Sequence, residues 1–142
     1  MSALREREHP GHGVVLVAYD GSEAARRGLL HAAALVGGGG RVTIVNVIPV
    51  QSVSARLQTV SDDQRERQRE LLIGAQALLE RRGVKATLVG TLGDPIVEIL
   101  AAAEEASAGT LVIGRGRRGR ALHTRVAERL VRRAGCDVLV VQ

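Results

Sequence analysis

The feature that most constrains the fold is an alternation of short apolar runs with longer amphipathic stretches. The first run, "VVLVA" at residues 14–18, is followed by Asp20 and then by a helix-like segment. A continuous apolar run of this length is typical of a strand buried on both faces of a parallel sheet. Four further strands are expected, at residues 41–49, 84–92, 110–114 and 137–141.

Helix-start signals lie between these strands. Ser22 is placed as an N-cap, "SDDQ" at 61–64 is a capping box, and Asp94-Pro95 opens a helix cleanly. The expected helices run from Ser22 to residue 36, from 61 to about 82, through 95–107, and over about 122–134. Five strands that alternate with four helices predict an α/β fold, a parallel sheet with helices on both faces.

The composition fits one folded domain. The chain has 142 residues, 45% of them hydrophobic, and Tyr19 is its only aromatic residue. We expect residues 1–12 to form a flexible tail, residues 13–142 to form a single domain, and residues 51–59 to form a loop. Cys136 is the only cysteine, which favours a reducing compartment. With no signal-peptide pattern and no apolar run of membrane-spanning length, the sequence predicts a cytoplasmic protein with no membrane partner.

The positive charge is concentrated at one end. The net charge is +5, and residues 114–142 hold eight arginines against Glu128 and Asp137. A concentrated patch says more about binding partners than the net charge does. A nucleic acid is disfavoured because the chain has almost no aromatic residues to stack on bases. Arg125, Arg129 and Arg132 share one helical face, which we interpret as solvated.

Ligands of open parallel sheets bind beyond the carboxyl ends of the strands. The candidate positions are Asp20-Gly21-Ser22, Asn46-Val47, Gly93-Asp94 and the loop that begins at Gly114. That loop contains a literal G-x-G-x-x-G. The motif follows the fourth strand and not the first, so a dinucleotide-binding dehydrogenase is excluded, and no Gly-Lys-Ser/Thr is present to make a Walker loop.

Four blocks of the sequence resemble the universal stress protein family: "VVLVAYDGSEAARRGLLHAA", "VTIVNVIP", "GDPIVEILAAAEEASAGTLVIGRG" and "VAERLVRRAGCDVLVV". The resemblance covers nearly all of residues 14–142. It implies a five-stranded sheet of order 3-2-1-4-5, with ATP or AMP bound between the first and fourth strands, accompanied by Mg²⁺ in the case of ATP. It also implies a homodimer built on the last strand.

Four positions match the nucleotide contacts of the family. Ala18 and Asp20 match positions beside the ribose and phosphates, Val47 matches the position whose backbone holds adenine, and Gly114 matches the first glycine of the phosphate loop. Beyond Gly114 the sequence departs from the family pattern.

The departure has two possible registers. Counting forward from Gly114 puts Arg117 at the second glycine, and counting back from "VAERL" puts Thr124-Arg125 where Gly-Ser belongs. Alternatively, Gly116 and Gly119 serve as the glycine pair. The loop is short, yet its arginines offer bidentate phosphate contacts and Thr124 offers a hydroxyl.

Three functions stay open at this point. The first is a stress-response protein that binds an adenine nucleotide and at most hydrolyses ATP very slowly. The second is a homodimeric interaction protein of the same fold without a nucleotide, and the third is a nucleic-acid binder. The edge strand "DVLVV" at 137–141 favours a dimer on its own, because it carries no lysine, proline or inward charge.

Overall fold

The computed structural model of the chain describes residues 14–50, 60–115 and 121–142. The expectations for the tail at 1–12 and the loop at 51–59 fall outside these ranges. The described residues contain five strands and four helices, in the predicted alternation.

The strands form one parallel sheet of order β3-β2-β1-β4-β5, the order that the family resemblance implied. Ala18, at the end of β1, pairs with Val45 of β2 on one side and with Ile113 of β4 on the other. The point where the strand order reverses therefore lies at β1 and β4. The strands are β1 (Val14–Ala18), β2 (Arg41–Pro49), β3 (Lys85–Gly93), β4 (Thr110–Gly114) and β5 (Asp137–Val141).

The helices begin where the capping signals predicted. Ser22 accepts a hydrogen bond from the backbone of Ala25, Ser61 and Gln64 form a complete capping box, and Asp94 caps a helix that starts with proline. The helices are α2 (Glu23–Val36), α4 (Asp62–Glu80), α5 (Pro95–Glu105) and α6 (Ala121–Arg133). Two ends were predicted too late. Helix α4 stops at Glu80 because the chain turns into Gly83, at φ +74°, and α5 stops two residues before Ser107, which has a φ of +52°.

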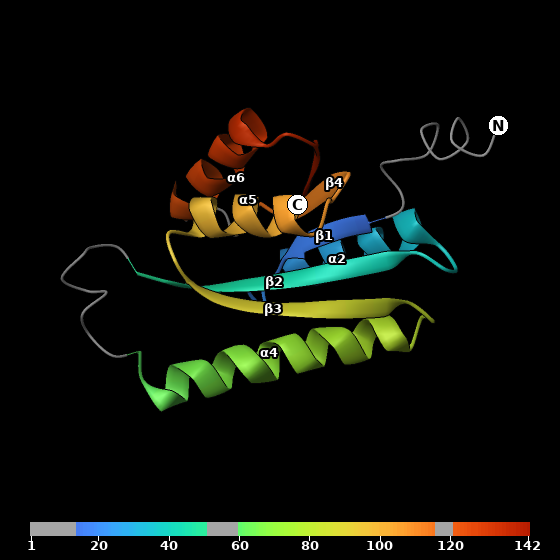
Figure 1. Cartoon of the computed structure of the whole chain (residues 1–142), viewed down its shortest axis with the longest axis horizontal. Coiled ribbons are helices and arrows are strands. Elements are labelled where there is room, and N and C mark those ends of the chain that lie inside the picture. The colour runs from blue at the N-terminus through green and yellow to red at the C-terminus, as the bar shows by residue number, and fades with distance from the viewer. Residues whose placement is uncertain (1–13, 51–59, 116–120) are drawn as a thin grey trace.

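The helices cover both faces of the sheet, as expected. Figure 1 shows α4 on one side of the sheet and α5 and α6 on the other. Side chains alternate along β1, so Val15 and Val17 pack in the core with α2 and α4, whereas Leu16 packs in the core with α5 and α6. The central strand is thus buried on both faces, which explains its unbroken apolar sequence.

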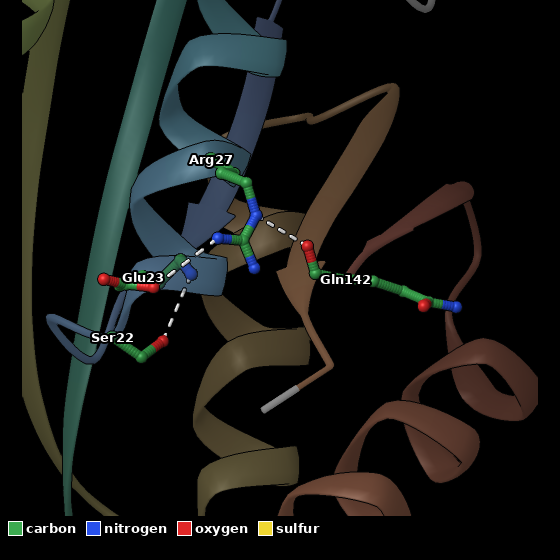
Figure 2. Close-up of polar contacts among 5 residues, drawn as sticks. Ser22, Glu23, Arg27 and Gln142 are labelled. Atoms are coloured by element: carbon green, nitrogen blue, oxygen red, sulfur yellow. Dashed lines mark hydrogen bonds and ion pairs between the residues drawn. The ribbon is translucent and has the colours of Figure 1, made fainter. Parts of the chain in front are cut away.

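Helix α2 also holds the end of the chain. Arg27 donates from Nε to the backbone carbonyl of Gln142 at 2.6 Å, while its Nη1 lies 3.9 Å from a carboxylate oxygen of Glu23 (Figure 2). The ion pair joins exposed side chains and adds little stability. The hydrogen bond connects α2 to the residue that follows β5 and fixes the position of that strand beside the helix.

Candidate functional site

A cleft of about 400 Å³ opens at the carboxyl ends of the strands, on the side of the sheet that α5 and α6 cover. Its volume lies within the range of small-molecule sites. Strands β1, β2 and β4 contribute one wall, and α5 and α6 contribute the other. The lining residues are Ala18, Tyr19, Asp20, Ala25, Val45, Asn46, Val47, Pro49, Asp94, Pro95, Ile96, Ile99, Ile113, Gly114, Val126 and Arg129.

The end of β1 places a carboxylate at the mouth of this cleft. Asp20 Oδ1 accepts a hydrogen bond from the backbone nitrogen of Ser22 at 2.9 Å. Gly21 lies between them at φ +83°, a conformation that glycine adopts without strain. Ser22 then caps α2, which confirms its interpretation as a cap. The turn holds Asp20 exposed at the strand end, and the same carboxylate lines the cleft.

Strand β2 continues past the point where its ladder with β1 ends. The last paired residue is Val45, and one further bond runs from the nitrogen of Tyr19 to the carbonyl of Val45 at 2.8 Å. The side chain of Asn46 then donates to the carbonyl of Tyr19 at 2.8 Å. This bond takes the place of a strand contact, and it leaves Val47 as part of the cleft wall beyond the ladder.

Asn46 is held in turn by Gln68 of α4. The Gln68 amide nitrogen lies 3.0 Å from the Asn46 carbonyl, 3.1 Å from Asn46 Oδ1 and 2.9 Å from the Thr91 carbonyl. Gly90 leaves room for this side chain, since a Cβ there would lie 2.8 Å from Gln68 Oε1. The network fixes the ends of β1, β2 and β3 relative to one another.

Gly114 has a packing role that its match to a phosphate loop did not suggest. A Cβ at this position would lie 2.8 Å from the nitrogen of Ala25 and 2.9 Å from two atoms of Ala24. The first turn of α2 therefore packs directly on the backbone of β4. A larger residue here would force α2 and β4 apart, whether or not a phosphate approaches this position.

The charged side chains of the cleft lie on different elements. Asp20 follows β1, and Asp94 precedes α5, where its Oδ1 accepts from the nitrogen of Val97 at 3.1 Å. Arg129 contributes the only cation among the described lining residues, from the third turn of α6. We expected Arg129 to belong to a solvated face. It is exposed, and it also lines the cleft.

The structure brings together four of the predicted site residues. Ala18, Asp20, Val47 and Gly114 all line the cleft. Gly116, Arg117 and Gly119 lie outside the described residues, and so does the side chain of Thr124. Arg125 is exposed on α6 and does not line the cleft. Sequence reasoning missed Arg129, although its spacing of three residues from Val126, which also lines the cleft, places the two on one side of the helix.

Other chemistry finds little support in the described residues. Burial raises the pKa of the Cys136 thiol above its ordinary value, and the nearby Asp137 carboxylate raises it further. The thiol is therefore protonated at neutral pH and is a poor nucleophile. Within the described ranges, no three His, Cys, Asp or Glu side chains gather as a metal site. None of the described helices combines the length and the apolar character that crossing a bilayer requires.

A second hollow, of about 370 Å³, lies on the flank of the sheet. Residues of β2 and β3 form one wall of it, and residues of α5 form the other. We call it the flank groove; its lining residues are Val14, Arg41, Thr43, Thr87, Val89, Thr91, Glu98, Ala101, Ala102, Glu105 and Ala106. Thr91 Oγ1 is buried there and has no hydrogen-bond partner among the described residues. A lone hydroxyl of this kind is ordinarily satisfied by an ordered water molecule.

Comparison with known proteins assigns the fold to one family. The sequence model of the universal stress protein family matches residues 12–142. No curated protein sequence matches the chain. A solved structure of a universal stress family protein from Burkholderia pseudomallei is 31% identical, with a TM-score of 0.68, and the match covers 92% of this chain and 96% of that one.

Two further solved structures carry ligands. A universal stress protein in complex with cAMP is 19% identical with a TM-score of 0.72, and the match covers 93% of this chain and 98% of that one. The universal stress protein of Archaeoglobus fulgidus in complex with dAMP is 23% identical with a TM-score of 0.71, over 91% of this chain and 96% of that one. At these identities the likeness establishes the shared fold.

Proposed function

The chain belongs to the universal stress protein family, and we propose that it binds an adenine nucleotide in the cleft at the carboxyl ends of β1, β2 and β4. One observation carries the proposal. The four positions that match the family's nucleotide contacts, Ala18, Asp20, Val47 and Gly114, converge on this one cleft although they come from three strands. The relatives solved with cAMP and dAMP support an adenine nucleotide as the class of ligand.

The proposed roles follow from the chemistry of each position. Val47 lies beyond the β1–β2 ladder and presents backbone groups to the base. The Asp20 carboxylate accepts hydrogen bonds from the ribose hydroxyls. Ala18 and Ile113 line the cleft and offer apolar contacts to the ligand. A triphosphate would bring Mg²⁺ with it, and a monophosphate needs no metal.

Equilibrium binding of AMP and ATP to the purified chain, with and without Mg²⁺, tests the proposal. The informative variant is Asp20→Asn, because it keeps the acceptor for the Ser22 nitrogen and removes the charge. We expect it to weaken binding about tenfold, which is about 1.4 kcal/mol. Glu104→Ala, an exposed change on α5 outside the cleft, is the control and leaves the affinity unchanged. A chain that binds neither nucleotide would overturn the proposal.

A homodimer through β5 is the second proposal, and it stands with or without a nucleotide. The nitrogen of Asp137 donates to the carbonyl of Gly109 at 3.3 Å, and the carbonyl of Val141 accepts from Arg115 at 2.7 Å. Odd-numbered residues of β5 therefore bond to β4. Because the direction alternates along a strand, Val138 and Val140 point their backbone groups to the free edge, where a second copy of β5 can pair with them.

This alternation gives a sharp test with two neighbouring prolines. Val140→Pro removes a donor that points outward, so we expect a folded monomer where the native chain is a dimer. Leu139→Pro removes a donor of the β4–β5 ladder, so we expect it to destabilise the fold. Light scattering reports the mass and circular dichroism reports the folding. A native chain that is monomeric at micromolar concentration, or a Val140→Pro variant that stays dimeric, would contradict the β5 dimer.

A further inference from the structure

The phosphate end of the proposed ligand has a cation available that does not belong to the glycine loop. Arg129 lines the cleft from α6, one helical turn after Val126. It makes no hydrogen bond or ion pair with any described residue. Arg129 is exposed, and no described carboxylate lies within ion-pair distance of it.

The other charged side chains of the cleft carry the same sign as a phosphate. They are the carboxylates of Asp20, which follows the end of β1, and of Asp94, which caps the start of α5. A carboxylate by itself repels a phosphate, and this repulsion is stronger in a partly enclosed cleft than in water. Among the described lining residues, the α6 wall carries the only cationic side chain.

We propose that Arg129 is the residue that binds the ligand's phosphate in this cleft. The inference rests on the proposed nucleotide function and adds the orientation of the ligand. The base and ribose lie toward Val47 and Asp20, and the phosphate lies toward α6. A guanidinium can donate two parallel hydrogen bonds to a phosphate, which supplies both affinity and orientation.

This assignment gives a physical reason for the altered loop sequence. Where a family member holds phosphate with backbone groups of a glycine-rich turn, this chain has a side chain on a regular helix for the same purpose. Helix α6 packs into the core through Ala127 and Leu130, on either side of Arg129 in sequence. The backbone of Arg129 is therefore held by a packed helix, so only the side chain has to be ordered when the phosphate binds.

The test compares AMP with adenosine on three variants. Arg129→Ala should weaken AMP binding by about tenfold or more while adenosine binding stays within about twofold. Arg129→Gln should behave like Arg129→Ala, because it keeps much of the side-chain volume without the charge. Arg132→Ala, an exposed change on the same helix that does not line the cleft, is the control, and at an ionic strength of about 0.15 M it should leave both affinities unchanged.

Each other outcome overturns the assignment. Equal loss of AMP and adenosine binding would mean that Arg129 supports the cleft without touching phosphate. A loss for Arg132→Ala as large as that for Arg129→Ala would mean that bulk charge acts. Native AMP affinity in Arg129→Ala would place the phosphate elsewhere and leave the nucleotide proposal standing. A native chain that binds neither AMP nor adenosine would instead refute the nucleotide proposal itself.

Discussion

Helix α5 separates two hollows of nearly the same size, and they differ in what surrounds them. The cleft, of about 400 Å³, gathers residues from β1, β2, β4, α5 and α6. The flank groove, of about 370 Å³, lies against one flat face of β2 and β3 and the opposite side of α5. Each contains charged side chains, Asp20, Asp94 and Arg129 in the cleft and Arg41, Glu98 and Glu105 in the groove.

The difference lies in the backbone. The groove floor runs along a continuous ladder in which β2 pairs with β3 from Arg41 to Pro49. The cleft begins where the ladder between β1 and β2 stops, after Ala18 and Val45. Backbone groups at strand ends are available to a ligand, whereas those within a ladder are already paired. The two hollows are therefore similar in size and charge, and they differ in whether they lie at strand ends or along a paired ladder.

The parts of the fold that the sequence predicts are those that depend on local signals. The starts of α2, α4 and α5 follow from caps of a few neighbouring residues, such as Ser61 with Gln64, and each strand follows from an apolar run. The strand order came from the family resemblance. Helix ends were less certain from sequence, because α4 and α5 end two residues early in turns that the periodicity does not reveal.

Of the site residues, the sequence predicted those that lie at the ends of strands. Ala18, Asp20 and Val47 reach the cleft because parallel strands end at the same edge of the sheet. The packing role of Gly114 was not visible, since it depends on a contact with Ala24 and Ala25, far away in the chain. Arg129 was missed because an arginine stripe on a helix is usually solvated, and its place in the cleft depends on how α6 packs.

The largest expected effect is the loss of stability when a side chain is added at Gly114, on the wall of the cleft. Gly114→Ala would drive a Cβ to 2.8 Å from the Ala25 nitrogen, so the first turn of α2 must move. We expect a loss of about 1–3 kcal/mol in the free energy of unfolding, measured by urea denaturation.

The matched control for this change is Gly74→Ala, in the exposed interior of α4, where an added Cβ meets nothing within 4 Å. It should stabilise the chain by about 0.5–1 kcal/mol, because alanine favours the helix. If Gly114→Ala unfolds at the same urea concentration as the native chain, the contact between β4 and α2 is not tight, and position 114 does not need a glycine.

The smallest expected effect comes from placing the same substitution in each hollow. Ala18→Leu puts a larger side chain on the floor of the cleft, and Ala101→Leu puts one in the flank groove, where Ala101 is exposed on α5. If only the cleft takes the nucleotide, Ala18→Leu should lower AMP affinity about tenfold or more. Ala101→Leu should leave it within about twofold, as a surface change does. Calorimetric titration of both variants measures the affinities, and thermal denaturation verifies that each is folded. If Ala101→Leu lowers the AMP affinity and Ala18→Leu does not, the nucleotide binds in the flank groove. The position of the strand ends would then not predict the binding site.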